Sequence, residues 1–349
     1  MKENKLCLNP WNFLAIEADG NCFFCCSIFS SDKFSIGNIF EQNINEIWNG
    51  DKAKDFRKDV LDLLYSHCDT QRCRFGYARY GWGGGTLECR TDSLIAPLPQ
   101  VVHLIYDYSC SQRCIFCRDS IQYFTKEEEK KYNYVIDTKL IPLLSNAKIL
   151  SLNGGGEIFD SIHSKLLLKK AIEKYDDLSL ELWSNGIKFT KENIEALNIQ
   201  NRIKIAHISV NAASKEVYKK IFRVDNFERV KQNILYLNEL KENKIIEEIQ
   251  LHFIVNEKNY RDMKKFMKFV NTIEAVVSFS PTSPVHATAF TEKEEIYAVH
   301  KTAHFLYNDF VRRLKDPIYK STNCSLDFDT NLKPIPLLTV IKNFINRYK

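Results

Sequence analysis

Residues 101–117 read VVHLIYDYSCSQRCIFC and join an apolar run to three closely spaced cysteines. The run from Val101 to Tyr108 predicts a strand, and Cys110, Cys114 and Cys117 follow it with the spacing C-x3-C-x2-C. Thiolates are the usual ligands of iron–sulfur clusters, and three cysteines leave one iron of a [4Fe–4S] cluster open to another ligand. The stretch therefore predicts a reactive iron–sulfur site at the mouth of a strand.

A structural zinc site is the alternative for these thiols. Zinc closes its tetrahedron with a fourth protein ligand, and His103 is the nearest candidate. Because His103 lies within the predicted strand rather than in the loop, the iron–sulfur interpretation is favoured.

The composition is that of an ordinary globular protein. Its 349 residues are 44% hydrophobic and 27% charged, and they carry a net charge of +5 without basic blocks, so no nucleic-acid partner is indicated. No apolar run has transmembrane length and no signal peptide is found at the N-terminus, so no membrane partner is expected. The eleven cysteines stand in close groups, which in a reducing cytoplasm favours metal binding over disulfides. A cytoplasmic location is therefore expected.

From Val101 onward, short apolar runs alternate with amphipathic stretches, which is the pattern of parallel βα units. Strands are expected at 101–108, 148–153, 179–184, 203–210, 247–255 and 275–280. Helices are expected near 126–144, 161–175, 190–198, 214–241 with a break near Asp225, 258–272 and 291–315. Six such units are fewer than the eight of a closed TIM barrel.

The loop after the second predicted strand contains Gly155, Gly156 and Glu157. Glycines let the backbone come close to a ligand, and a carboxylate attracts an ammonium group. A plain strand-to-helix turn is the alternative. The position of this loop, at the carboxyl end of a parallel strand, favours ligand binding.

The three-cysteine motif, with Phe116 before its last cysteine, and the Gly-Gly-Glu loop resemble the signatures of radical S-adenosylmethionine (SAM) enzymes. The resemblance implies a partial (β/α)6 TIM-like barrel, a SAM-binding [4Fe–4S] cluster on Cys110, Cys114 and Cys117, and SAM as cofactor. Ile158 stands where the family often has proline. The further SAM contacts implied at later strand ends and in the helix after the fourth strand are Ser184, Asn185, Ser209, Asn211 and Arg223. For Arg223, a solvated surface arginine is an equal alternative.

The resemblance also implies a mechanism. SAM would bind the open iron and be cleaved reductively to a 5′-deoxyadenosyl radical, which abstracts hydrogen from a small-molecule, sugar or peptide substrate. A flavodoxin- or ferredoxin-like reductant is the implied partner.

The N-terminal stretch contains a second set of cysteines. Cys7, Cys25, Cys68 and Cys73 surround a predicted strand with an Asp-Gly turn at Gly20 and a helix near 51–65. This arrangement resembles a SPASM or twitch domain, the auxiliary-cluster module of many radical SAM enzymes. The resemblance implies one auxiliary [4Fe–4S] cluster, ligated by these four cysteines, with a role in electron transfer or substrate contact.

The N-terminal module departs from the family in two ways. It precedes the barrel instead of following it, and fewer cysteines follow its helix. A second auxiliary cluster would need Cys22, Cys26 or Cys89, and for each of these a small buried side chain is the favoured alternative.

The expected domains are a small α+β auxiliary domain at 1–75, a linker at 76–100, a barrel at 101–285 and a helical extension at 286–349. Cys324 in the extension is a candidate hydrogen-atom donor for an epimerase, with an inert buried cysteine as the alternative. Oxidation or epimerisation is the expected reaction. A non-catalytic iron–sulfur electron carrier or partner protein is the alternative function.

Overall fold

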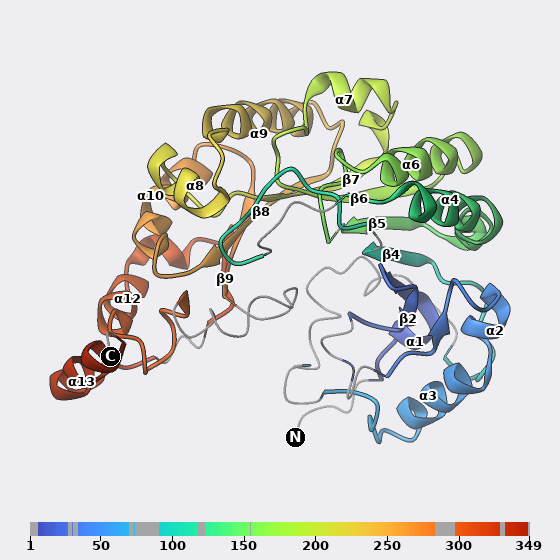
Figure 1. Ribbon diagram of the computed structural model, residues 1–349, viewed down its shortest axis with the longest axis horizontal. Helices are drawn as coiled ribbons and strands as arrows, with labels where there is room; N and C mark the ends of the chain where they lie inside the picture. Colours follow the sequence, from blue (N-terminus) through green and yellow to red (C-terminus); the bar gives the residue numbers. More distant parts are fainter. Residues whose placement is uncertain are drawn as a thin grey trace. The chain divides into compact units, whose positions relative to one another are not determined.

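A computed structural model describes residues 6–26, 30, 34–69, 73, 91–105, 107–117, 123–153, 155–282, 297–328 and 332–347. The chain divides into two compact units. Unit 1 comprises Met1–Cys110, Tyr123–Trp183 and Leu197–Lys204, and unit 2 comprises Ser111–Gln122, Ser184–Ala196 and Ile205–Lys349. Each unit is an α/β structure with a mostly parallel sheet (Figure 1). The expected α/β class is therefore confirmed.

Unit 1 contains the strands β1 to β6 in the order β6-β5-β4-β1-β2-β3. The strands are β1 (Phe13–Glu17), β2 (Asn21–Phe23), β3 (Gly37–Asn38), β4 (Val101–Ile105), β5 (Ile149–Asn153) and β6 (Ser179–Ser184). The helices are α1 (Asn9–Asn12), α2 (Ile44–Trp48), α3 (Asp51–Leu61), α4 (Lys126–Val135), α5 (Ile141–Leu143) and α6 (Ile162–Lys174). A π-helical turn, Ile136–Leu140, joins α4 to α5, and α4 and α6 lie side by side (Figure 1).

The N-terminal strand β1 pairs in parallel with β4, with Phe13 opposite Val101 and Ala15 opposite His103. The predicted strand and Gly20 turn are present, because β1 also pairs antiparallel with β2, whereas the parallel pairing with β4 was not expected. The first four residues of β1 are all buried, and a strand that is apolar on both faces is stabilised in the interior of a sheet. The N-terminal segment therefore extends the sheet that begins the predicted barrel.

Arg57 on α3 organises the N-terminal segment. Its guanidinium is fully buried and donates hydrogen bonds to the carbonyl oxygens of Pro10 (2.9 Å) and Leu94 (2.8 Å). It also lies over the rings of Phe24 and Trp48, at 5.1 and 4.9 Å from their centroids. Burial lowers the pKa of Arg57 to about 10. One cation therefore joins the start of the chain, α3 and the segment that precedes β4.

Unit 2 contains the strand order β10-β9-β8-β7, and the pairs β7–β8, β8–β9 and β9–β10 are parallel. The strands are β7 (Ile203–Ser209), β8 (Glu248–Val255), β9 (Val276–Pro281) and β10 (Cys324–Leu326). The helices are α7 (Lys191–Ala196), α8 (Lys215–Phe222), α9 (Phe227–Glu242), α10 (Met263–Val270), α12 (Tyr307–Leu314) and α13 (Leu337–Arg347). The six predicted strands from 101 to 280 agree with β4 to β9 within a few residues.

Some expectations differ from the structure or lie outside the part that it describes. The last predicted helix, 291–315, is shorter, because the described helix α12 spans only Tyr307–Leu314 and residues 291–296 are not described. Strand β10 was not expected. Most of the predicted linker at 76–100 and Cys89 also lie outside the described residues. The predicted domain boundaries and the partial barrel stay predictions.

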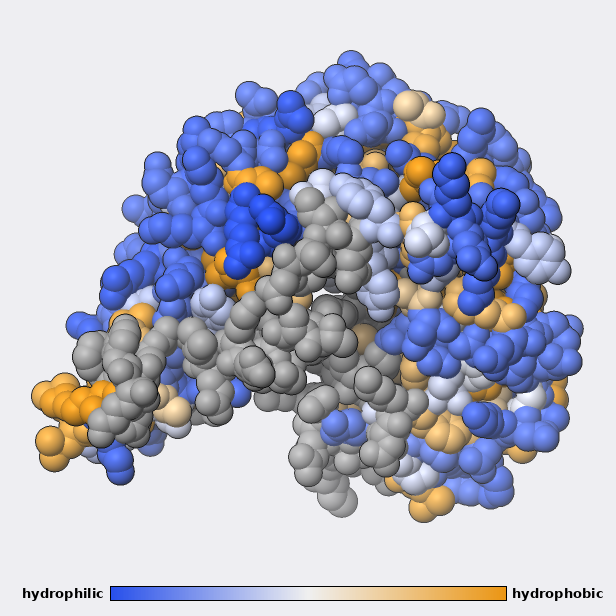
Figure 2. Space-filling view, viewed as in Figure 1, coloured by the Kyte–Doolittle hydropathy of each residue, from blue (hydrophilic) through white to orange (hydrophobic). Residues whose placement is uncertain are grey.

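The surface of α13 is partly apolar, and the helices of the described residues are short. Helix α13 presents exposed apolar side chains, and Figure 2 shows hydrophobic residues gathered at this helix. They are Leu337, Leu338, Ile341 and Ile345. None of the described helices has both the length and the apolar character needed to cross a membrane.

Candidate functional site

The loop after β4 packs directly against the glycine loop after β5, and both belong to unit 1. The backbone N–H of Glu157 donates to the carbonyl oxygen of Ser109 at 2.7 Å, one residue before Cys110. The buried Asp107 fixes the same loop, because its Oδ1 accepts from the Ser109 N–H at 2.7 Å and its Oδ2 accepts from the Ser161 hydroxyl. The predicted cluster loop and the predicted SAM-binding loop are therefore tied together.

Gly156 allows this close approach. A Cβ atom at Gly156 would lie 2.1 Å from the Ser109 carbonyl oxygen, which is backbone and cannot rotate away. A Cβ atom at Gly155 would instead meet the ring of Tyr108 at 2.4 Å, and that side chain is 42% exposed. A side chain at position 156 would therefore force the backbone to move, whereas one at position 155 would need only the Tyr108 ring to move.

The Glu157 carboxylate is only 2% exposed, and its Oε1 accepts a hydrogen bond from the Phe159 N–H at 3.3 Å. Ile158, at the position where the family often has proline, is buried in the core. A carboxylate at this position can also attract a ligand ammonium group.

The second part of the three-cysteine motif lies in unit 2 and is held by α8. The Ile115 N–H donates to the Ile221 carbonyl oxygen at 2.9 Å, and the Gln112 side chain donates to the Tyr218 hydroxyl at 3.2 Å. The Cys117 N–H donates to the Cys114 carbonyl oxygen at 3.1 Å, which closes a tight turn between these two cysteines. Phe116 within this turn is half-buried. Tyr218 carried no signal in the sequence that pointed to this role.

Ser184 and Asn185, at the end of β6, form a compact turn. The Ser184 hydroxyl accepts from the Gly186 N–H and the Asn185 Oδ1 accepts from the Ile187 N–H, both at 3.0 Å. The φ angle of Gly186 is +79°, and Asn233 on α9 donates to its carbonyl oxygen at 2.7 Å. Hydrogen bonds within unit 2 therefore hold this turn in shape.

The three remaining predicted SAM contacts have different surroundings. Ser209 is the last residue of β7 and is half-buried. Asn211 is buried, and its Oδ1 accepts from the Ile254 N–H at 2.6 Å, so part of its side chain already joins β7 to β8. Arg223 is exposed and ends α8 with a left-handed φ of 58°. Their contacts with SAM stay predictions.

The four predicted auxiliary ligands lie close together in unit 1. Burial raises the pKa of the Cys25 thiol well above its usual value, and the neighbouring thiols Cys7, Cys26, Cys73 and Cys68 raise it further. Thiolates this close repel one another unless a cationic centre is shared, so the donor set is suited to an iron–sulfur cluster.

Cys68 shows the same environment. Burial raises its pKa to about 12, with Cys7, Cys73 and Asp59 adding to the shift. Cys22 points elsewhere: it is fully buried, its thiol donates to the Gly20 carbonyl oxygen, and burial raises its pKa to about 12. Cys26 is therefore a fifth thiol at the auxiliary set, whereas Cys22 is a core residue.

The described cysteines are all outside disulfides. Among the described residues, no three His, Cys, Asp or Glu side chains are spaced to hold a single metal ion. A single ion needs its ligands around one centre, whereas each cysteine of a [4Fe–4S] cluster binds a different iron, so the thiols of a cluster site lie farther apart.

Cys324, the predicted hydrogen-atom donor, is the first residue of β10 and is in register with Val277, which is fully buried. Paired residues on neighbouring strands share a face, so Cys324 faces the same side as Val277, and Ser325 faces the opposite side. Burial raises the pKa of Cys324 to about 11, with Asp327 adding to the shift. These observations favour the inert alternative, and the donor role stays a prediction.

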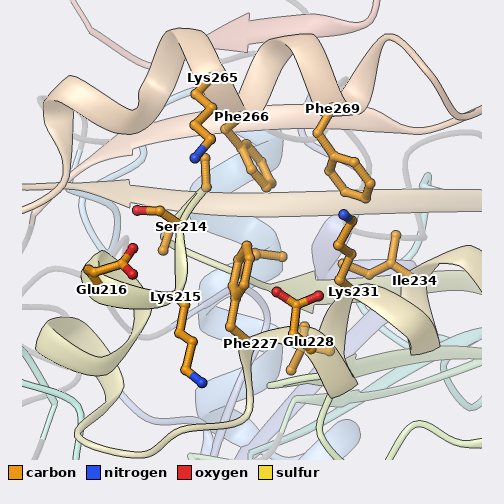
Figure 3. A pocket seen from close by; sticks show the side chains of 14 residues that line it. Ser214, Lys215, Glu216, Phe227, Glu228, Lys231, Ile234, Lys265, Phe266 and Phe269 are labelled. Atoms are coloured by element: carbon orange, nitrogen blue, oxygen red, sulfur yellow. The ribbon is translucent and has the colours of Figure 1, made fainter.

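A cavity of about 340 Å³ opens between α8, α9 and α10 of unit 2 (Figure 3). Its lining combines the rings of Phe227, Phe266 and Phe269 with the charged side chains of Lys231 and Glu228. None of the predicted site residues lines it.

A comparison with protein families bears on the N-terminal segment. Residues 7–74 match SPASM, described as an iron–sulfur cluster-binding domain. The SPASM resemblance is confirmed. We call residues 7–74 the SPASM segment.

A curated relative points in the same direction. The S-adenosyl-L-methionine-dependent 2-deoxy-scyllo-inosamine dehydrogenase of Niallia circulans is 40% identical over 57 residues, which are 16% of this chain and 22% of that protein. Together with the SPASM match, this relative supports the resemblance to radical SAM enzymes and agrees with the expected cofactors, [4Fe–4S] clusters and SAM.

Solved structures of similar arrangement include SuiB from Streptococcus suis, with a TM-score of 0.48, 14% identity, and coverage of 82% of this chain and 56% of that chain. Native anSMEcpe with bound AdoMet has a TM-score of 0.44 and 15% identity, and 65% of this chain covers 63% of that chain. In each comparison, less than two thirds of the relative's length is covered.

Proposed function

We propose that this protein is a radical SAM enzyme that oxidises an alcohol of a small polar substrate. The observation that carries the proposal is the direct hydrogen bond between the Glu157 N–H and the Ser109 carbonyl oxygen, beside Cys110. It joins the two motifs that the reaction needs, the cluster loop and the ammonium-binding loop. The bound cluster and SAM would supply a 5′-deoxyadenosyl radical that takes a hydrogen atom from a substrate C–H bond.

The chain's own residues would prepare this chemistry. Cys110, Cys114 and Cys117 would hold three irons of the cluster, and the buried Glu157 would pair with the SAM ammonium. Gly156 keeps the two loops in contact, and the Ser184 turn is pre-organised to meet a polar ligand. A cofactor and substrate held in fixed orientations lose less entropy on reaching the transition state, which lowers the activation free energy of hydrogen abstraction.

The SPASM segment supports oxidation. Removal of a hydrogen atom, one electron and one proton converts an alcohol to a carbonyl group, and the electron needs an acceptor. An auxiliary cluster on Cys7, Cys25, Cys68 and Cys73 would be that acceptor. The curated relative is a dehydrogenase, which favours the same outcome. Epimerisation is disfavoured because Cys324 shares the face of the buried Val277.

The test is an anaerobic assay of the reconstituted protein with SAM and a strong reductant, in which 5′-deoxyadenosine is measured. We expect the product from the wild type and from Cys22→Ala, and none from Cys117→Ala. Absence of 5′-deoxyadenosine from wild-type protein with an intact cluster would favour the electron-carrier alternative. A flavodoxin- or ferredoxin-like reductant and a cytoplasmic location belong to the same proposal.

A further inference from the structure

One face of strands β7 to β10 in unit 2 carries several polar side chains and is not the face on which α10 packs. On β8, Leu251 and Phe253 are fully buried, whereas His252 between them is partly exposed. On β9, Phe279 is fully buried, and its ring lies 6.3 Å from that of Phe266 on α10. The alternation along β8 and β9 therefore directs Leu251, Phe253 and Phe279 toward the helices. The opposite face combines polar side chains with the apolar Ile254 and Val276.

Strand register brings the polar side chains of four strands onto this face. His252 is opposite Ser209 on β7 and Ser278 on β9, and Ser278 is opposite Ser325 on β10. In parallel strands, residues in register point to the same side. The face therefore includes Ser209, which is a predicted SAM contact.

A fixed carboxylate lies at the end of this row. Asp327 follows β10, and its Oδ2 accepts hydrogen bonds from the hydroxyls of Ser278 (2.8 Å) and Ser280 (2.5 Å). Its Oδ1 accepts from the Ser325 hydroxyl at 3.1 Å, and its backbone N–H donates to the Phe279 carbonyl oxygen at 3.0 Å. Asp327 nevertheless remains exposed. The carboxylate is held in place while part of it stays available to a ligand.

Two histidines complete the row. His207 Nδ1 lies 3.0 Å from His252 Nε2, so one ring must donate and the other accept. Burial lowers the pKa of His252 to about 4, although the nearby Asp327 acts in the opposite direction. At neutral pH His252 is therefore a neutral hydrogen-bonding group, and the negative charge of Asp327 is not cancelled by an imidazolium.

This face favours one class of ligand. Several hydroxyls and neutral imidazoles suit the hydroxyl groups of a polyol, and one fixed carboxylate suits a single ammonium group. An acidic ligand would be repelled by Asp327, and an apolar ligand would leave these polar groups without hydrogen bonds.

We propose that the polar face of β7 to β10 binds the substrate, and that the substrate is an amino-substituted polyol whose ammonium group pairs with Asp327. The inference rests on the proposed function, because this face includes Ser209, which is itself a proposed SAM contact. Asp327 is a specificity-determining residue in this scheme. The hydroxyl to be oxidised would bond to His252 or to the serines.

The test measures binding rather than turnover. Anaerobic holoprotein with SAM is titrated with two matched pairs of probes, glucosamine with glucose and galactosamine with galactose, and ligand-detected NMR reports the affinity. We expect the amines to bind more tightly than the neutral sugars. Asp327→Asn should lower the affinity for the amines about tenfold or more and leave the weak binding of the neutral sugars unchanged.

Asp176→Asn is the matched control, because it removes one carboxylate whose side chain is fully exposed and pairs only at 3.6 Å with Arg202. Thermal melting of each variant reports whether the fold is kept. Equal affinity for amines and neutral sugars, absence of binding by all four probes, or an unchanged affinity in Asp327→Asn would overturn the proposal. Selective binding of amines without 5′-deoxyadenosine formation would overturn the radical reaction and leave the binding site standing.

Discussion

At the scale of single residues, the contact between the two predicted motifs depends on Gly156. Gly155 and Gly156 are neighbours with the same side chain, yet an added methyl group meets different atoms. At Gly156 it would meet the Ser109 backbone oxygen at 2.1 Å, and at Gly155 the exposed ring of Tyr108 at 2.4 Å. A ring can rotate away, whereas the backbone oxygen beside Cys110 would have to move with its loop.

Gly156→Ala should therefore separate the Glu157 loop from the Ser109 loop. We expect it to destabilise the protein by roughly 1–3 kcal/mol and to lower SAM affinity at least tenfold. Gly155→Ala is the control and should have a clearly smaller effect on both. Melting temperature and SAM binding by equilibrium dialysis give the two readouts. Equal behaviour of the two variants would show that the backbone contact is unimportant.

At the scale of elements, α3 is held in the SPASM segment by a buried cation. Arg57 contacts the carbonyl oxygens of Pro10 and Leu94 and the rings of Phe24 and Trp48. Its removal would leave both carbonyl groups without this donor, and for the buried one, at Pro10, the cost is about 1–3 kcal/mol. Arg57 therefore stabilises the packing of three segments: α3, the chain that follows Cys7 and the segment before β4.

Arg57→Met should lower the free energy of unfolding by about 2–5 kcal/mol. Lys58→Met, one residue along the same helix, removes an exposed cation that pairs with Asp62, and it should leave stability nearly unchanged. Anaerobic thermal or urea unfolding of both variants measures the difference. A loss from Lys58→Met as large as that from Arg57→Met would contradict the assignment of Arg57 as the anchor.

At the scale of the whole molecule, the chain has two separate sets of thiols. Two [4Fe–4S] clusters correspond to about eight irons per chain. The double variant Cys25→Ala/Cys68→Ala should lose about half of the iron and retain SAM cleavage in part. Cys114→Ala/Cys117→Ala should lose the other half and all SAM cleavage.

Iron analysis of anaerobically purified protein checks this division, with Cys22→Ala as control because its thiol lies in the core. The control should keep the full iron content. Full iron content in Cys25→Ala/Cys68→Ala would show that these cysteines do not ligate an auxiliary cluster. Loss of all iron from either double variant would mean that the two sets do not bind independently.

The sequence by itself determined the six parallel strands from 101 to 280, because each is a short apolar run followed by a helical stretch. It also predicted both sets of cysteines as cluster ligands, because the first set lies on one loop and the second belongs to the segment that matches SPASM. The apolar runs are local in the sequence, and closely grouped cysteines have few roles in a protein besides metal binding and disulfide formation.

Tertiary structure alone decided which distant residues meet. It paired β1 with β4, seated Arg57 among groups from three segments, and brought the thiols of Cys7 and Cys73 together. It also turned Cys324 toward the side of Val277 and set Asp327 on the serines of β9. The physical reason is that a one-residue change of strand register reverses the face of every side chain. Register is fixed by packing across the whole sheet, which no short stretch of sequence contains.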